Sequence, residues 1–121
     1  MKKKIKSKPI FYAVCLPELQ RIAIDSGYNL LVHGSMSRDL DLVCVAWIDK
    51  PIGHYELLEK FRNYLGAMKS TTPDGKPYYS HSVLGGGRDS YIIHLNYGYN
   101  SFGEHTDDSW YLDISFTPQI K

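Results

Sequence analysis

Residues 32–47 read VHGSMSRDLDLVCVAW, and this stretch decides the fold that we expect for the chain. One apolar run ends at His33, six mostly small or polar residues follow, and a second apolar run begins at Leu40. A connection this short favours an antiparallel pair of strands. Asp39 and Asp41 stand two positions apart at the start of the second run. Because strand side chains at i and i+2 point to the same face, we expect these two carboxylates to converge.

The rest of the chain adds two helices and three further strands to this pair. Apolar residues recur at helical spacing over about 11–26 and 54–65, and a glycine follows each segment. Strand-like segments are found at 28–33, 40–48, 79–84, 91–97 and 110–116. The sequence therefore predicts an α+β fold, with a mixed, mostly antiparallel sheet and two helices packed on it.

The composition is that of an ordinary globular chain, with 43% of the 121 residues hydrophobic and 22% charged. The apolar run 42–48 is far too short to span a membrane. Five lysines fall within the first eight residues, and no long apolar region or cleavage site of a secretory signal follows them. We therefore expect a basic flexible arm at 1–9, a single domain at 10–121, a cytoplasmic location and no membrane partner.

The charge is unevenly distributed along the chain. Without the five N-terminal lysines, nine basic and thirteen acidic residues remain, which is a net charge of −4. General nucleic-acid binding needs a basic face that neutralises phosphates, so we do not expect it of this body. Cys15 and Cys44 stand among apolar residues, which is typical of core thiols and not of a disulfide or a zinc site.

A third carboxylate stands in the last predicted strand, where residues 111–116 read YLDISF. An aspartate in an apolar strand is costly unless it has a partner. If this strand lies beside the strand 40–48, Asp113 completes a cluster with Asp39 and Asp41. Oxygen ligands of this kind suit Mg²⁺ or Mn²⁺.

The order of these motifs resembles the nucleotidyltransferase superfamily of the polymerase-β type. The signature of that family is an apolar strand, then Gly-Ser, then Asp-x-Asp opening the next strand, and a third acidic residue on a later strand. The matching pieces here are LLVHGS (30–35), RDLDLVCV (38–45) and YLDISF (111–116), in the same order. The short layout is similar to that of small proteins carried by phages and their bacterial hosts.

The resemblance implies a site in which metal ions lie between carboxylates and nucleotide phosphates, with in-line nucleotidyl transfer to a small or protein acceptor. It implies that Asp39 and Asp41 are metal ligands, and that Asp113 ligates metal and activates the acceptor. Gly34 and Ser35 would contact the triphosphate. The implied cofactor is Mg²⁺ or Mn²⁺, and the implied partner is a nucleotide or a nucleotide-derived small molecule.

The connection between Gly-Ser and Asp-x-Asp is shorter here than in most members, with only residues 36–38 between them. This removes the helix start that helps to bind the triphosphate, and Arg38 is expected to supply part of the lost positive charge. Two other functions therefore remain as alternatives. One is a non-catalytic binder that sequesters a nucleotide or nucleotide-derived signal, and the other is a small interaction module whose carboxylates pair with Arg38 or Arg88. An open edge strand and ten tyrosines are also compatible with a homodimer.

Other histidine and glycine motifs give weaker alternatives to the metal site. His33-Gly34-Ser35 matches half of a two-histidine phosphoesterase, but the nearest partner, at 94–96, ends in Asn where Ser or Thr is needed. His33 and His94 are instead expected to line one cleft, in contact with phosphate or base. A hairpin turn accounts for the three glycines that precede Arg88.

Overall fold

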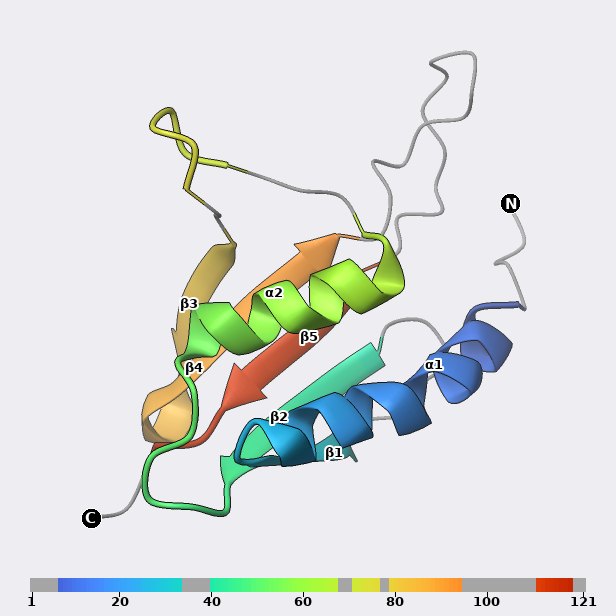
Figure 1. Ribbon diagram of the computed structural model, residues 1–121, viewed down its shortest axis with the longest axis horizontal. Coiled ribbons are helices and arrows are strands. Elements are labelled where there is room, and N and C mark those ends of the chain that lie inside the picture. Colours follow the sequence, from blue (N-terminus) through green and yellow to red (C-terminus); the bar gives the residue numbers. More distant parts are fainter. Residues whose placement is uncertain (1–6, 34–39, 68–70, 77–78, 95–110, 119–121) are drawn as a thin grey trace.

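The structure, a computed structural model, describes residues 7–33, 40–67, 71–76, 79–94 and 111–118. Figure 1 shows the helices and strands of these ranges. In chain order they are α1 (Ser7–Asp25), β1 (Tyr28–His33), β2 (Leu40–Ala46), α2 (His54–Leu65), β3 (Ser80–Leu84), the 3₁₀ turn η1 (Gly85–Gly87), β4 (Arg88–His94) and β5 (Tyr111–Phe116).

The five strands form one sheet in the order β1-β2-β5-β4-β3. β1 with β2, β3 with β4, and β4 with β5 are antiparallel, whereas β2 with β5 is parallel. The sheet is therefore mixed and mostly antiparallel, and the predicted α+β class is confirmed. β5 lies in the middle of the sheet, between two antiparallel hairpins (Figure 1).

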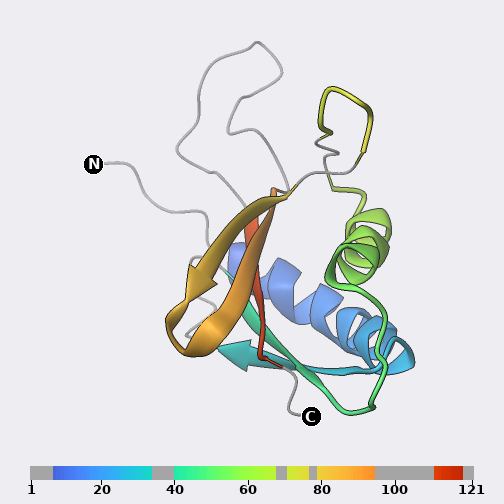
Figure 2. The same ribbon diagram turned by 90° about the vertical axis from the view of Figure 1, so that its left-hand side faces the viewer.

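Figure 2 shows both helices of the described part on one side of the sheet. Apolar side chains between the two layers form the core. They come from both helices and from alternate strand positions, and the fully buried ones include Tyr12, Leu19, Leu40, Leu42, Leu57, Leu58, Phe61, Ile93, Leu112, Ile114 and Phe116. The predicted core thiols, Cys15 and Cys44, are buried and free, and burial raises the pKa of both.

The face of the sheet away from the helices carries a different set of residues. On β2, buried Leu40, Leu42 and Cys44 alternate with half-buried positions that begin at Asp41. On β5, Asp113 likewise stands between buried Leu112 and Ile114, so it shares the helix-free face with Asp41. The alternation that buries the apolar residues thus places both carboxylates on the other side of the sheet.

Two glycines end the helices at the positions that the sequence predicts. Gly66, after α2, has a φ of 64°, and backbone N–H groups beyond the helix donate to its last carbonyls. Gly27, after α1, has a φ of 98°, and a Cβ atom there would lie 2.7 Å from Cδ1 of Ile48. A side chain at position 27 would therefore be both strained and without room.

Some element bounds differ from the sequence prediction. α1 begins at Ser7, so residues 7–9, which the sequence places in the flexible arm, are helical, and Pro17 lies inside the helix. β2 ends at Ala46, two residues early. β4 begins at Arg88, three residues early, because the hairpin with β3 is closed by a three-residue turn. Among the described residues, no helix is long and apolar enough to cross a membrane.

Candidate functional site

Asp41 and Asp113 lie directly opposite each other on the parallel pair β2–β5. The condition on which the predicted carboxylate cluster depended is therefore met for these two residues. Neighbouring strands are about 4.8 Å apart, and side chains in register point to the same face. Both aspartates are half-buried. Two carboxylates this close repel each other when both are ionised, unless a cation lies nearby.

A pocket of about 180 Å³ opens over these carboxylates on the helix-free face. Its lining, which we call the charged pocket, consists of His33, Asp41, Leu42, Val43, Leu84, Arg88, Asp113 and Ser115. Two carboxylates, a guanidinium, an imidazole and a hydroxyl therefore meet in one place. With about 30 Å³ for each water molecule, the pocket has room for about six waters. That space suits a phosphate group or a hydrated cation, and it is too small for a whole nucleotide.

A hydrogen bond fixes one of the two carboxylates. The Ser90 hydroxyl, on β4, donates to Oδ1 of Asp113 at 2.7 Å. Ser90 itself is buried and lies opposite Ser115 across the β4–β5 pair. A hydrogen bond from a hydroxyl to a carboxylate is a strong one, and it restricts the rotation of the carboxylate.

Arg88 reaches the charged pocket from the turn that precedes it. Gly86 and Gly87 each have a φ of 79°, so glycine is required for this hairpin, and the predicted turn is confirmed. The sequence analysis did not place Arg88 in the metal site. It gave Arg88 as an ion-pair partner in the alternative module, and it favoured a hairpin turn over a phosphate cradle for the segment 85–88. Arg88 and Ser90 stand two positions apart on β4, so their side chains share one face of the sheet. Only the pairing of β4 with β5 shows that this is the face that carries Asp113.

The two predicted histidines are placed differently. His33, at the end of β1, lies opposite Asp41 across the β1–β2 pair and lines the charged pocket. His94, at the end of β4, does not line that pocket. It lies opposite Tyr111, with 6.2 Å between the ring centroids. The antiparallel run of β4 brings its first residue to the pocket and carries its last residue beyond Asp113.

Four predicted site residues, Gly34, Ser35, Arg38 and Asp39, lie outside the described residues. Within the described ranges, no three His, Cys, Asp or Glu side chains are grouped so that they could hold a metal ion. Those ranges do not include Asp39, the remaining member of the predicted cluster with Asp41 and Asp113. The donors that they do place together, Asp41 and Asp113, are oxygen ligands, and these fit Mg²⁺ or Mn²⁺.

A second group of titratable side chains lies on the helix side of the sheet, and the sequence prediction missed it. Nε2 of His81 is 2.8 Å from Oδ1 of Asp89, and Nδ1 of His54 is 3.1 Å from the Tyr91 hydroxyl. The His54 ring stacks on Phe116 at a centroid distance of 3.9 Å. Burial lowers the pKa of His54, with nearby Asp89 opposing the shift and His81 adding to it.

The described part of the site therefore holds two carboxylates in register, a buried hydroxyl bonded to one of them, and a guanidinium and an imidazole in the same pocket. Neither a protein-family model nor a curated protein matches the sequence.

Proposed function

We propose that the protein binds a nucleotide together with Mg²⁺ or Mn²⁺ at the charged pocket, and that Asp41 and Asp113 hold the ion. The observation that carries this proposal is the register of the two aspartates on adjacent parallel strands, facing one pocket. A divalent cation offsets the repulsion between the carboxylates, and nucleotide phosphates complete the oxygen coordination that Mg²⁺ requires.

The other polar groups of the pocket support a phosphate ligand. The Arg88 guanidinium offers paired N–H donors, which match phosphate oxygens better than a lysine would. His33 adds a ring N–H on the opposite strand pair. Ser90 keeps the Asp113 carboxylate oriented through its hydrogen bond. When bound, the ion would neutralise phosphate charge and polarise a phosphoryl oxygen.

We also propose nucleotidyl transfer to a small or protein acceptor as the reaction. The support is the resemblance of the motif order to polymerase-β-type nucleotidyltransferases, in which the third carboxylate activates the acceptor. Asp113 has that place in this chain, and its carboxylate would accept the proton of the acceptor hydroxyl. In this proposal, Asp39, Gly34, Ser35 and Arg38 complete the metal and phosphate contacts.

Isothermal titration with the four ribonucleoside triphosphates, with and without Mg²⁺, tests the binding proposal. We expect Mg²⁺-dependent binding that weakens at least about tenfold in Asp41→Asn and in Asp113→Asn, a loss of about 1.4 kcal/mol. Asp25→Asn is the matched control, because Asp25 is an exposed aspartate on α1 that pairs with Arg21. Binding that ignores Mg²⁺, or that is unchanged in Asp41→Asn, would contradict the proposal.

Incubation with labelled triphosphates separates the reaction from simple capture. Transfer predicts release of pyrophosphate and a labelled acceptor, and both should disappear in Asp113→Asn. Stoichiometric recovery of intact nucleotide after denaturation would instead indicate a protein that sequesters its ligand.

A further inference from the structure

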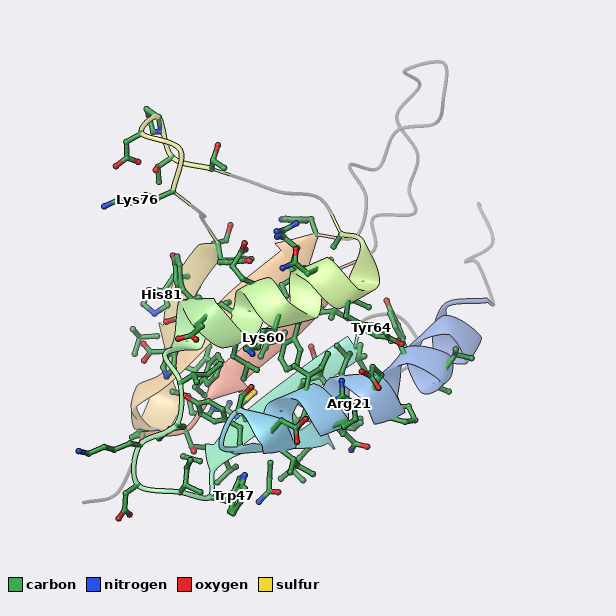
Figure 3. The ribbon with its side chains drawn as sticks, in the orientation of Figure 1. Arg21, Trp47, Lys60, Tyr64, Lys76 and His81 are labelled. Carbon is green, nitrogen blue, oxygen red and sulfur yellow. The ribbon has the colours of Figure 1, made fainter. Side chains whose placement is uncertain are left out.

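A second and larger pocket opens at the end of β2, where the chain turns toward α2. Its volume is about 620 Å³, and its lining consists of the apolar residues Val45, Ala46, Trp47, Ile48 and Pro118 together with Thr117 and Asp49. We call it the apolar pocket. Figure 3 shows Trp47 at this end of the sheet. Trp47 is 54% exposed here.

The apolar pocket continues the charged pocket along the same strand pair. Alternation along each strand places every second residue on the helix-free face. The residues of this series are Asp41, Val43 and Val45 on β2, and Asp113, Ser115 and Thr117 on and just after β5. The first two of each series line the charged pocket, and the third lines the apolar pocket.

The strand pair itself extends as far as the second pocket. The backbone N–H of Thr117 donates to the Cys44 carbonyl at 3.1 Å, one step beyond the end of β5. At about 3.3 Å of rise per residue, the four steps from Asp41 to Val45 cover about 13 Å. The two pockets therefore lie one after the other along the same strand pair.

The volumes of the two pockets indicate which part of a nucleotide each pocket can hold. Small-molecule sites usually measure about 300–1,000 Å³, so the charged pocket at about 180 Å³ is too small for a nucleoside. The apolar pocket, at about 620 Å³, lies within that range. A ligand with its phosphates at Asp41 and Asp113 must place its remaining atoms elsewhere, and the apolar pocket lies further along the same strand pair.

Trp47 is held in a position that suits a stacked ring. Its indole N–H donates to the Ile24 carbonyl at the end of α1, at 3.3 Å, while half of the side chain stays accessible. A tethered aromatic ring loses little freedom when a planar group stacks on it. Stacking on aromatic side chains is a common way to hold a base, and it tolerates any base because each has a π face.

We propose that the apolar pocket binds the base of the nucleotide whose phosphates occupy the charged pocket, with Trp47 as the stacking platform. This inference rests on the proposed function, since it takes the charged pocket as the phosphate end of the same ligand. It adds a residue and a ligand group that the sequence motifs do not indicate.

Paired titrations with a nucleoside triphosphate and with inorganic triphosphate, both in Mg²⁺, test the proposal. We expect Trp47→Ala to weaken binding of the nucleoside triphosphate about tenfold or more and to leave inorganic triphosphate unchanged. Trp47→Phe should keep most of the affinity. Tyr64→Ala is the matched control, because Tyr64 is an exposed aromatic on α2 outside both pockets.

Fluorescence gives a second measurement that does not need a Trp47 variant to fold. The chain has two tryptophans, so Trp110→Phe leaves Trp47 as the single reporter. We expect its emission to be quenched by the nucleoside triphosphate and not by inorganic triphosphate.

The outcomes separate this inference from the proposed function. Suppose that the nucleoside triphosphate and inorganic triphosphate bind equally, that both bindings require Asp41, and that the Trp47 emission does not change. The base site is then refuted and the phosphate site stands. If neither ligand shows binding that depends on Asp41, the proposed function fails and this inference fails with it.

Discussion

Neighbouring side chains of β4 face opposite ways and have different roles. Ser90 holds Asp113 on the helix-free face, whereas Asp89 lies beside His81 and His54 on the helix side. The strand thus contributes to the charged pocket with one face and to a histidine cluster with the other. Each face gives a separate test.

We expect Ser90→Ala to lower the free energy of unfolding by about 1–2 kcal/mol, because it leaves a half-buried carboxylate oxygen without its donor. Ser82→Ala is the control, since Ser82 lies opposite Ser90 on β3 but is exposed. Urea denaturation of both variants at neutral pH measures the difference. Equal stabilities would show that the hydrogen bond contributes nothing.

We expect stability to fall as the pH drops through the ordinary histidine pKa of about 6.5. Burial lowers the pKa of His54, so below that value the unfolded chain takes up a proton that the folded chain resists. The contribution is complete above the unfolded pKa and is lost on acidification toward the folded one. Asp89, His81 and Tyr91 are the titratable groups that face this ring.

Denaturation midpoints between pH 8 and pH 5 measure this dependence. His54→Gln should make the denaturation midpoint less dependent on pH, because a glutamine side chain does not take up a proton in this range. An unchanged pH profile in that variant would assign the dependence to other groups.

At the level of elements, the joint between α1 and β1 depends on one glycine. We expect Gly27→Ala to cost about 2 kcal/mol or more, because a φ of 98° is strained for alanine and its Cβ would lie 2.7 Å from Ile48. Gly53→Ala is the matched control, because its φ is −64° and no atom lies within 4 Å of the added carbon. Urea denaturation compares them, and a neutral Gly27→Ala would mean that the joint relaxes freely.

Local patterns predicted some elements well. The bounds of β1 and α2 agree with the prediction, because strand alternation and a helical stripe ending at Gly66 are properties of contiguous residues. The ends of α1 and β2 were less well predicted, since Pro17 inside a helix and the turn after Ala46 depend on packing against other elements.

The site was predictable only in part, for the same reason. Asp41 and Asp113 stood out as carboxylates in apolar strands, but their pairing depends on a strand order that no local pattern fixes. Arg88 and Trp47 were not among the predicted site residues. Their roles follow from the position of β5 between β2 and β4, which brings distant segments together.

At the level of the whole molecule, the two faces of the sheet differ in role. The helix side of the sheet holds the core (Figure 2), and the helix-free side carries the charged pocket. A substitution on the helix-free face that keeps the Ser90–Asp113 hydrogen bond should therefore change the proposed ligand binding with little effect on packing. The reverse holds for the buried positions of the same strands, so the two properties are separable residue by residue.

The central place of β5 has a consequence for how the protein is made. A ribosome delivers the chain from its N-terminus, so the β1–β2 hairpin and the β3–β4 hairpin emerge before the strand that joins them. Until β5 arrives, Asp41 and Arg88 belong to two separate pieces, and the second carboxylate is missing. A nascent chain therefore lacks the proposed phosphate site, and the proposed binding should appear in a single late step, together with the completed sheet.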